Sequence, residues 1–598
     1  MQTAFGVDMD HGGGCRFSVW APNAEAVYLL GDFNDWHKDS HPLQREEIGG
    51  GWSVVVPDAQ ENQEYQYRIL YQGQDLRRQD PYARKVVHSS SNAVIQRPPC
   101  APEGGNCEFH TPNLNDLVIY ELHIGTFGKG HAEGDGSATF KSTLPYLDEL
   151  KDLGINAIEI MPIHEFPGGI SWGYNPACLF AVESDYGTAQ DFYDFVEAAH
   201  QRGIAVILDV VYNHFGPDDL DLWQFDGWQE NGKGGIYFYN DWRSTTPWGD
   251  TRPDYGRPEV RQFIIDNALM WARDFRVDGL RVDMSVFIRT VNGMDGDPGN
   301  ELADGWSLMQ AVNCAVHEFN PCFITIAEDM QDSEWLTKSV PDNGGGYNIQ
   351  WDAFFVHSLR DTLLQPDDMA RDMDTLVEAI GRRFNNDAFE RVLYTESHDE
   401  VANGQARVPE DASPGAADSW VAKRKSLLGA GIIFTVPGIP MIFQGQEFLE
   451  DGWFEDTREL DRSKQERHSG VLQAYRDLIH LRLNRSGNSA GLCGQNVQVF
   501  HVNHAHKVMA FHRWQEGGAG DSVVVIANFS AQEQSGYTIG MPAGGEWRAC
   551  FNSDSKLYDE QFADTGLAML TTAEQGQDGL AASATLDLPP YALLVFCQ

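Results

Sequence analysis

The sequence lacks three features that would place the protein at a membrane or in an oxidising compartment. No apolar stretch approaches the roughly 20 residues that a membrane-spanning helix needs. The opening MQTAFGVDMDHGGG has neither the basic start nor the apolar core of a secretory signal. The nine cysteines are scattered, without a CxxC pair or a Cys/His cluster at zinc spacing. These absences predict a cytoplasmic protein with reduced thiols and no structural metal.

Positive charge is scarce. The chain has 43 Lys and Arg residues against 88 Asp and Glu residues, which gives a formal net charge of −45 at pH 7. Binding to phosphate groups needs clustered Lys and Arg, so this balance argues against a nucleic acid or an anionic membrane as partner. The simplest interpretation is solubility. A salt-adapted source is an additional hypothesis, because an acidic surface repels itself unless ions screen it.

A length of 598 residues exceeds one ordinary domain and favours about three. Short alternating runs separated by Gly, Asn and Asp turns occupy 15–20, 26–30, 52–56 and 65–71. They predict an N-terminal β-sandwich over 1–96, followed by a Pro/Gly-rich linker over 97–116. Similar runs return at 497–502, 508–512, 523–528 and 592–596. They predict a C-terminal all-β domain, a second β-sandwich, over 485–598.

The region between them, 117–484, alternates short apolar runs with amphipathic stretches. This alternating pattern is typical of a parallel sheet with outer helices. Eight strand candidates can be counted, at 117–122, 157–161, 205–211, 279–282, 323–327, 348–351, 392–395 and 440–443. A helix is predicted over 258–275, with Pro258 in its first turn. The fold class is therefore α/β, a (β/α)8 barrel flanked by two β domains, with the active site at the carboxyl ends of the strands.

Four polar clusters follow four of these strands. They are DVVYNH at 209–214, GLRVD at 279–283, IAED at 326–329 and ESHDE at 396–400. Each one places a carboxylate just beyond an apolar run. Cleavage of a glycosidic bond with retention takes one carboxylate as nucleophile and a second, protonated one to release the leaving group, about 5–5.5 Å apart. Acids that converge on one barrel mouth supply both.

These acids have two other possible roles, as helix caps or loop residues and as metal ligands. An isolated Asp is more often a helix N-cap or a solvated loop residue, but four clusters in register with four strands argue against that. A metal-dependent barrel enzyme also uses carboxylates and His at strand ends. Arg281 lies two residues before Asp283. A fixed cation beside a candidate ligand opposes metal binding and favours a carboxylate that stays ionised.

The motif series resembles that of the α-amylase superfamily, glycoside hydrolase family 13. The four clusters occur in the family's order, with GINAIEIMP upstream and GIPMIFQGQE downstream, over about 117–450. The stretch WAPNAEAVYLLGDFNDW at 20–36 resembles the carbohydrate-module-like domain that precedes the barrel in branching enzymes, debranching enzymes and trehalohydrolases. The resemblance implies an α-glucan substrate such as starch, glycogen or maltooligosaccharides.

The resemblance also implies roles for the three acids. Asp283 is expected to be the nucleophile, and Arg281 would hold it ionised. Glu328 is expected to be the acid/base, with a pKa raised by its surroundings. Asp399 would hold the hydroxyls of the distorted sugar ring and stabilise the transition state.

Further residues are expected to bind substrate. The resemblance implies hydrogen bonds from His214 and His398 to the sugar, stacking by Tyr174 in SWGYNP, and structural support from Asp209. Each histidine, and Tyr174, could instead have a purely structural role. Trp248 lies in an aromatic loop, 239–250, that would either stack on glucose or pack internally.

The motifs identify the superfamily more clearly than the particular member of it. GDFNDW at 31–36, ITIAED and SHDEV resemble glycogen branching enzymes, whereas 117–214 and TPWGD at 246–250 resemble malto-oligosyltrehalose trehalohydrolases. Branching is placed first, endo-acting amylase-type hydrolysis second and trehalohydrolase third. A non-catalytic glycan-binding protein is the other alternative, but it would be expected to lack one of the acids.

Three smaller expectations concern Met284, metal ions and the N-terminal domain. The family usually has a small residue after the nucleophile, and Met284 departs from this at the first acceptor subsite. No cofactor is expected to be required; family analogy allows a structural calcium ion, but no acidic cluster has an EF-hand spacing. The N-terminal domain is expected to pack on the barrel, with Trp20 or Trp36 either contacting glucan or lying in the sandwich core.

Overall fold

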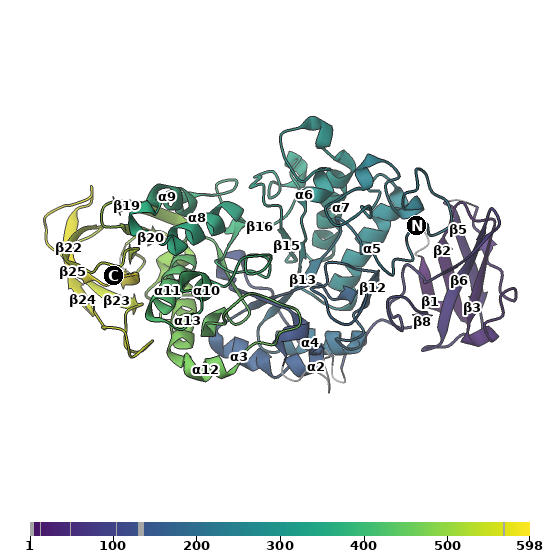
Figure 1. The fold of residues 1–598 in the computed structure, drawn as a ribbon, viewed down its shortest axis with the longest axis horizontal. Helices are drawn as coiled ribbons and strands as arrows, with labels where there is room; N and C mark the ends of the chain where they lie inside the picture. The colour runs from purple at the N-terminus through teal and green to yellow at the C-terminus, as the bar shows by residue number, and fades with distance from the viewer. Residues whose placement is uncertain are drawn as a thin grey trace.

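The computed structural model describes residues 5–11, 14–47, 49–102, 105–128, 137–518, 520–565 and 568–598. Residues 1–4 and 12–13 of the opening segment, and 103 and 104 of the predicted linker, lie outside the described residues. The molecule is elongated (Figure 1), with an N-terminal β domain in purple at one end, a helix-rich body in the middle and a C-terminal β domain in yellow at the other. The domain boundaries at single-residue level stay predictions.

The N-terminal domain consists of two antiparallel sheets, in the orders β1-β2-β5-β4 and β3-β6-β7, with β8 paired to β6. Alternating side chains of both sheets are buried between them, among them Phe17 and Tyr67. The predicted β-sandwich is confirmed. Its strands are β1 Gly6–His11, β2 Gly14–Trp20, β3 Ala26–Gly31, β4 Gln44–Arg45, β5 Gly51–Val56, β6 Glu64–Tyr71, β7 Gln74–Arg78 and β8 Ala93–Val94.

This domain packs on the central body through polar and aromatic contacts. Arg78 donates to the carbonyl oxygens of Gln224 and Phe225, at 3.1 Å each. Trp20 is 5% exposed and meets Tyr237 edge-on, with ring centroids 5.3 Å apart. Trp20 is therefore an interface residue with almost no surface left for a ligand.

The central body is a closed barrel of eight parallel strands. Their order is β10-β13-β14-β15-β16-β17-β18-β9, so each strand pairs with its chain neighbour and the last pairs with the first. The predicted barrel is confirmed, and the predicted strand ends differ from the observed ones by no more than two residues. The strands are β9 Ile119–Leu122, β10 Ala157–Ile160, β13 Ala205–Val210, β14 Gly279–Val282, β15 Ile324–Ala327, β16 Ile349–Trp351, β17 Arg391–Leu393 and β18 Ile439–Phe443.

Helices surround this barrel, and a small hairpin, β11 His164–Glu165 with β12 Cys178–Val182, lies beside it. The predicted helix over 258–275 is observed as α5, with its proline at the start. The helices are α1 Ile124–Phe127, α2 Phe140–Thr143, α3 Tyr146–Leu153, α4 Ala189–His200, α5 Pro258–Asp274, α6 Val286–Arg289, α7 Ala303–Phe319, α8 Ala353–Leu364, α9 Met373–Gly381, α10 Val408–Ala412, α11 Trp420–Thr435, α12 Ser463–Arg467 and α13 Ser469–Arg482.

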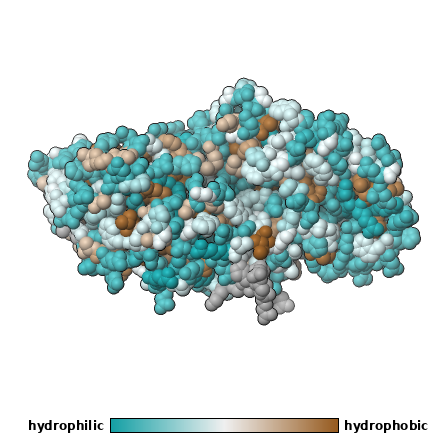
Figure 2. Space-filling model, viewed as in Figure 1, coloured by the Kyte–Doolittle hydropathy of each residue, from teal (hydrophilic) through white to brown (hydrophobic). Residues whose placement is uncertain are grey.

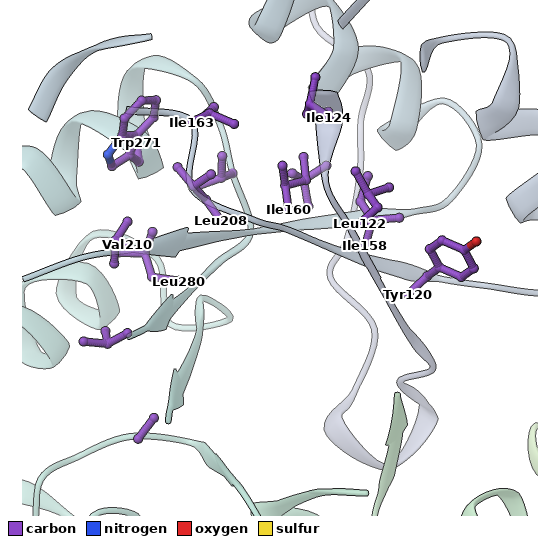
Figure 3. Close-up of a cluster of buried hydrophobic side chains, with 14 of the residues drawn as sticks. Tyr120, Leu122, Ile124, Ile158, Ile160, Ile163, Leu208, Val210, Trp271 and Leu280 are labelled. Carbon is purple, nitrogen blue, oxygen red and sulfur yellow. The ribbon is translucent and has the colours of Figure 1, made fainter. Parts of the chain in front are cut away.

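Side chains of the barrel strands alternate between two buried surfaces. One set, which includes Tyr120, Ile158 and Leu208, points outward toward the helices (Figure 3). The other set fills the inside of the barrel with residues such as Ile119 and Ile326. Because both faces of each strand are buried, the strands are mostly apolar in the sequence, with single charged residues such as Glu121 and Arg281 among them.

One glycine is needed for the barrel to close at the strand that carries the GLRVD motif. A Cβ on Gly279 would lie 2.6 Å from the carbonyl oxygen of Ile324 on the neighbouring strand. That separation is too short for any side chain, so Gly279 permits the close approach of β14 and β15. The two strands then present Asp283 and Glu328 side by side just beyond their ends.

The C-terminal domain is a six-stranded sheet, β19-β20-β21-β26-β23-β24, covered by the pair β22-β25. The predicted all-β domain is confirmed. It contacts the barrel body through the buried ion pair of Arg424 on α11 with Asp554. Its strands are β19 Asn496–Asn503, β20 Val508–Trp514, β21 Val523–Asn528, β22 Gln534–Met541, β23 Glu546–Asn552, β24 Met569–Thr571, β25 Ala582–Leu588 and β26 Ala592–Cys597.

The molecular surface is mostly hydrophilic in the view of Figure 2, with small separated hydrophobic patches. Within the described residues, no helix combines the length and the apolar content needed to cross a membrane.

Candidate active site

The site is organised around one buried guanidinium. Arg281 on β14 is fully buried, and its Nη1 lies 2.6 Å from Asp209 Oδ2 and 3.2 Å from Asp283 Oδ1. Its Nη2 lies 2.8 Å from Glu328 Oε2, close enough for an ion pair although Nη2 does not form a hydrogen bond. The indole of Trp351 on β16 lies beneath the guanidinium, with the Arg281 Cζ 4.5 Å from the ring centroid. A single cation thus contacts three carboxyl groups from three strands.

Asp283 lies directly after β14 and is 5% exposed. Besides Arg281, it is held by Asn213, whose Nδ2 donates to Asp283 Oδ2 at 2.6 Å. Burial raises the pKa of Asp283 to about 6, although the Arg281 charge acts to lower it. The carboxyl group is therefore predominantly ionised at neutral pH.

Glu328 lies directly after β15 and is 3% exposed. Its Oε2 accepts a hydrogen bond of 2.8 Å from the backbone N–H of Met284. Burial raises the pKa of Glu328 to about 7; Arg281 opposes the rise, and the negative charges of Asp283 and Asp399 add to it. Near neutral pH this group holds a proton for a substantial part of the time, whereas Asp283 does so less.

Met284, the residue that departs from the family pattern, has a left-handed backbone with φ of +37°. This conformation is uncommon for a residue with a side chain. It directs the Met284 N–H toward Glu328. The backbone at this position therefore contributes to the site directly, and the Met284 side chain is half-buried.

Asp399 and His398 follow β17 and differ in exposure. Asp399 is exposed at the barrel mouth and accepts a hydrogen bond of 3.1 Å from Asn403. His398 is 4% exposed, and its Nδ1 lies 2.5 Å from Oε1 of Glu121 on β9. Burial lowers the pKa of His398, but the Glu121 carboxylate raises it, and the result is about 9. His398 is therefore a cation at neutral pH.

Tyr174 and Asp209 join this network from neighbouring loops and strands. Tyr174 donates from its hydroxyl to Asp209 Oδ2 at 2.5 Å, and its ring stacks on that of His398 with centroids 5.0 Å apart. Asp209 is 2% exposed, and burial raises its pKa to about 6. Asp209 contacts both Arg281 and Tyr174, and its supporting role stays a prediction.

His214 and Trp248 form a stacked pair, with ring centroids 4.6 Å apart. His214 is 1% exposed, its Nε2 lies 2.9 Å from the carbonyl oxygen of Tyr174, and its Nδ1 is close to Asn213 Oδ1. Burial lowers the pKa of His214 to about 4, so it is neutral. Trp248 is 39% exposed. A hydrogen bond from His214 to a sugar stays a prediction, because both of its ring nitrogens contact protein oxygens.

Sequence reasoning missed two residues of the site. Asn213 was recognised only as part of a motif, yet it is the second hydrogen-bond donor to Asp283. Glu121 was recognised only as part of a strand, yet it orients and charges His398. The signal for Glu121 was available in IYEL at 119–122, since a carboxylate inside a fully buried strand needs a partner.

Among the described residues, no group of three His, Cys, Asp or Glu side chains is placed to hold a metal ion. The calcium ion that family analogy allows stays an expectation. The nine cysteines are free thiols.

Fold and site together define a class of protein. Two buried carboxyl groups with unequal pKa values, on the two arms of one guanidinium at a barrel mouth, fit glycosidases and transglycosidases that use a carboxylate pair.

Family models match three parts of the chain. The alpha amylase catalytic domain matches residues 126–242 and 222–478, carbohydrate-binding module 48 (isoamylase N-terminal domain) matches 4–83, and the alpha amylase C-terminal all-beta domain matches 500–597. The chain belongs to the α-amylase family, glycoside hydrolase family 13.

Curated relatives are similar over nearly the whole chain. The 1,4-alpha-glucan branching enzyme GlgB of Oceanobacillus iheyensis is 29% identical over 632 residues, covering 98% of this chain and 93% of the relative. That of Novosphingobium aromaticivorans is 31% identical and covers 97% and 81%.

Solved structures share the fold. An Anoxybacillus pullulanase complexed with maltotetraose has a TM-score of 0.75 at 19% identity, covering 99% of this chain and 87% of the other. The catalytic module of the pneumococcal glycogen-degrading protein SpuA has a TM-score of 0.76 at 18% identity, covering 100% and 97%.

Proposed function

We propose that this family member is a 1,4-α-glucan branching enzyme, which cleaves an α-1,4 bond and transfers the released chain to a 6-hydroxyl group of another glucan. The carboxyl pair supports the double displacement. Asp283 has the lower pKa and is suited to be the nucleophile, and Glu328 has the higher pKa and is suited to be the acid. Likeness to branching enzymes over 98% of the chain supports the transfer outcome.

In the first half of the proposed reaction, Asp283 attacks the anomeric carbon and forms a glycosyl ester, while Glu328 donates its proton to the departing 4-oxygen. In the second half, Glu328 takes the proton of an incoming 6-hydroxyl, whose oxygen bonds to the anomeric carbon as the ester bond breaks. Water attacks in place of the hydroxyl when the enzyme hydrolyses. Both the nucleophile and the proton come from side chains, so the proposed reaction requires no cofactor.

The remaining residues receive roles in the same scheme. Arg281 keeps Asp283 ionised, and Asp209 and Tyr174 hold Arg281 and form the wall of the sugar subsite. Asp399, exposed at the mouth, would bind sugar hydroxyls. His398 uses Nδ1 and its backbone N–H on Glu121, which leaves Nε2 as the donor to the substrate.

We further place the enzyme in the cytoplasm, a location that the nine free thiols support.

Product analysis of an amylose digest tests the proposed reaction. Branching gives new α-1,6 anomeric proton signals at a constant number of reducing ends, because each cut is matched by a transfer. An increase in reducing ends without an α-1,6 signal would refute branching and indicate amylase-type hydrolysis. Release of trehalose from maltooligosyl-trehalose would indicate the trehalohydrolase alternative.

A further inference from the structure

A cavity lies between the loops that follow β14 and β15, the two strands that end at Asp283 and Glu328. It has a volume of about 540 Å³, within the range of ligand sites. Residues 289–303 form one wall and residues 333–343 the other. The side chains used below are Arg289, Asp295, Glu301, Trp306 and Trp335. We call this cavity the loop groove.

Trp335 is an exposed aromatic side chain that is held in place. The residue is 49% exposed, whereas the next residue, Leu336, is fully buried and anchors the segment. The carbonyl oxygen of Trp335 accepts a hydrogen bond from the Gly345 N–H at 2.8 Å. The Lys338 ammonium lies 3.8 Å from the centroid of the Trp335 ring and also pairs with Glu334. A positioned and exposed indole in a cavity is a surface on which an apolar ligand face can stack.

The other groups in the loop groove suit an uncharged polar ligand. Trp306, at the start of α7, is half-buried and adds a second aromatic ring. Asp295 and Glu301 provide carboxylate oxygens that accept hydrogen bonds from hydroxyl groups. These carboxylates, and the formal net charge of −45, oppose an anionic ligand. A glucan has hydroxyl edges and apolar ring faces, which match both kinds of group.

Arg289 links the wall of the loop groove to the residue that follows Glu328. Asp329, the next residue, is fully buried and accepts hydrogen bonds from Arg289 at 2.8 and 2.5 Å. Arg289 also pairs with Asp295 in the wall of the groove. The attacking hydroxyl must lie within hydrogen-bond reach of Glu328 to lose its proton. A chain that delivers this hydroxyl therefore passes the start of the loop after β15, and residues 333–343 further along that loop help to line the groove.

From these contacts, and resting on the proposed transferase function, we infer that the loop groove binds the acceptor α-glucan chain, with a glucose ring stacked on Trp335. The groove then favours transfer over hydrolysis, because a bound acceptor competes with water for the glycosyl ester on Asp283.

The test separates the two halves of the reaction with maltosyl fluoride as donor and maltoheptaose as acceptor. Fluoride needs no acceptor-side contacts, so the first-turnover fluoride burst of Trp335→Ala is expected to equal that of the wild type. The maltoheptaose concentration that gives half-maximal transfer is expected to rise about five- to tenfold, the scale of one aromatic stacking contact. Trp335→Phe keeps a planar face and is expected to restore most of the affinity.

Trp335→Leu keeps apolar bulk without a planar face, and it provides a second variant if alanine disturbs the loop. Phe319→Ala is the matched control, since Phe319 is 50% exposed at the far end of α7, roughly 20 Å along the helix from the groove. It is expected to behave as the wild type. Unchanged acceptor half-saturation in Trp335→Leu, or a fluoride burst that falls as much as transfer does, would overturn the inference.

Different results would refute the proposed function and the inference about the loop groove. If the wild type forms α-1,4 links or only hydrolyses, the branching proposal fails. The groove is then tested by binding of maltoheptaose to Asp283→Asn protein, with and without Trp335→Leu. Equal affinities would refute the groove.

Discussion

The unequal pKa values of the carboxyl pair predict a bell-shaped pH profile for kcat/KM. Activity requires Asp283 ionised, so it falls below pH 6, and Glu328 protonated, so it falls above pH 7. With a pKa of about 7 for Glu328, the protonated fraction is roughly 50-fold smaller at pH 9 than at pH 7. The maximum on soluble amylose is expected between pH 6 and 7.

Replacing Glu328 by Gln should remove one side of this profile. The variant has no proton to donate, so cleavage of amylose is expected to slow by about 10²–10⁴-fold. A fluoride leaving group needs no proton, so the first-turnover fluoride burst from maltosyl fluoride should be nearly retained. The burst should still fall below pH 6, because Asp283 still has to be ionised, but in neither protein should it fall above pH 7, because fluoride needs no proton.

The assay is a stopped-flow fluoride measurement from pH 4.5 to 9.5 on both proteins. An alkaline limb in the fluoride burst of Glu328→Gln would mean that another group contributes the upper pKa. Equal losses on amylose and on the fluoride would mean that Glu328 is not the acid. Either result would refute the assignment drawn from the carboxyl pair.

Three further predictions follow from single side chains. Asp283→Asn is expected to retain the fold and glucan binding but less than about 1% of activity, since the amide cannot form the glycosyl ester; more than a few per cent of activity on starch would exclude Asp283 as nucleophile. Glu121→Gln removes the charge that raises the pKa of His398, so His398 becomes neutral at lower pH. The alkaline limb of kcat/KM is therefore expected to move to lower pH. An unchanged pH profile would mean that catalysis does not use the charge of His398. Burial raises the pKa of Asp80 from 3.8 to about 6, so ionisation of Asp80 lowers the free energy of unfolding by about 3 kcal/mol in total as pH rises from about 4 to 6. Asp80→Asn should remove this pH dependence, which urea unfolding of the variant and the wild type at pH 4 and pH 8 would measure. If the difference in unfolding free energy between the two proteins is the same at both pH values, the prediction is contradicted.

The barrel could be predicted from sequence because its strands are buried on both faces. Each strand is mostly apolar, and the acids immediately after these runs are forced to the same rim by the parallel arrangement. Asp283 and Glu328 therefore follow from local patterns. The regular apolar pattern that allows this prediction is found in the strands and not in the loops between them.

Residues whose role depends on distant partners could not be assigned in this way. Glu121 occupies an ordinary strand position, and its partner, His398, is 277 residues away. Trp20 looks like a sandwich residue or a sugar platform, but it is buried against Tyr237 of the barrel body. The loop groove combines two irregular segments without periodicity, 289–303 and 333–343, which only the closed barrel brings together.

The arrangement around Arg281 also bears on how such a barrel changes in evolution. One guanidinium contacts Asp209, Asp283 and Glu328, so losing Arg281 leaves three buried carboxyl groups without their cation, at a cost of about 3–5 kcal/mol. Arg281 and its three carboxyl partners are therefore expected to be retained together in evolution. The walls of the loop groove lie outside this group and tolerate substitution more readily. New acceptor preferences are therefore expected to arise by exchange of loops around an unchanged charge network.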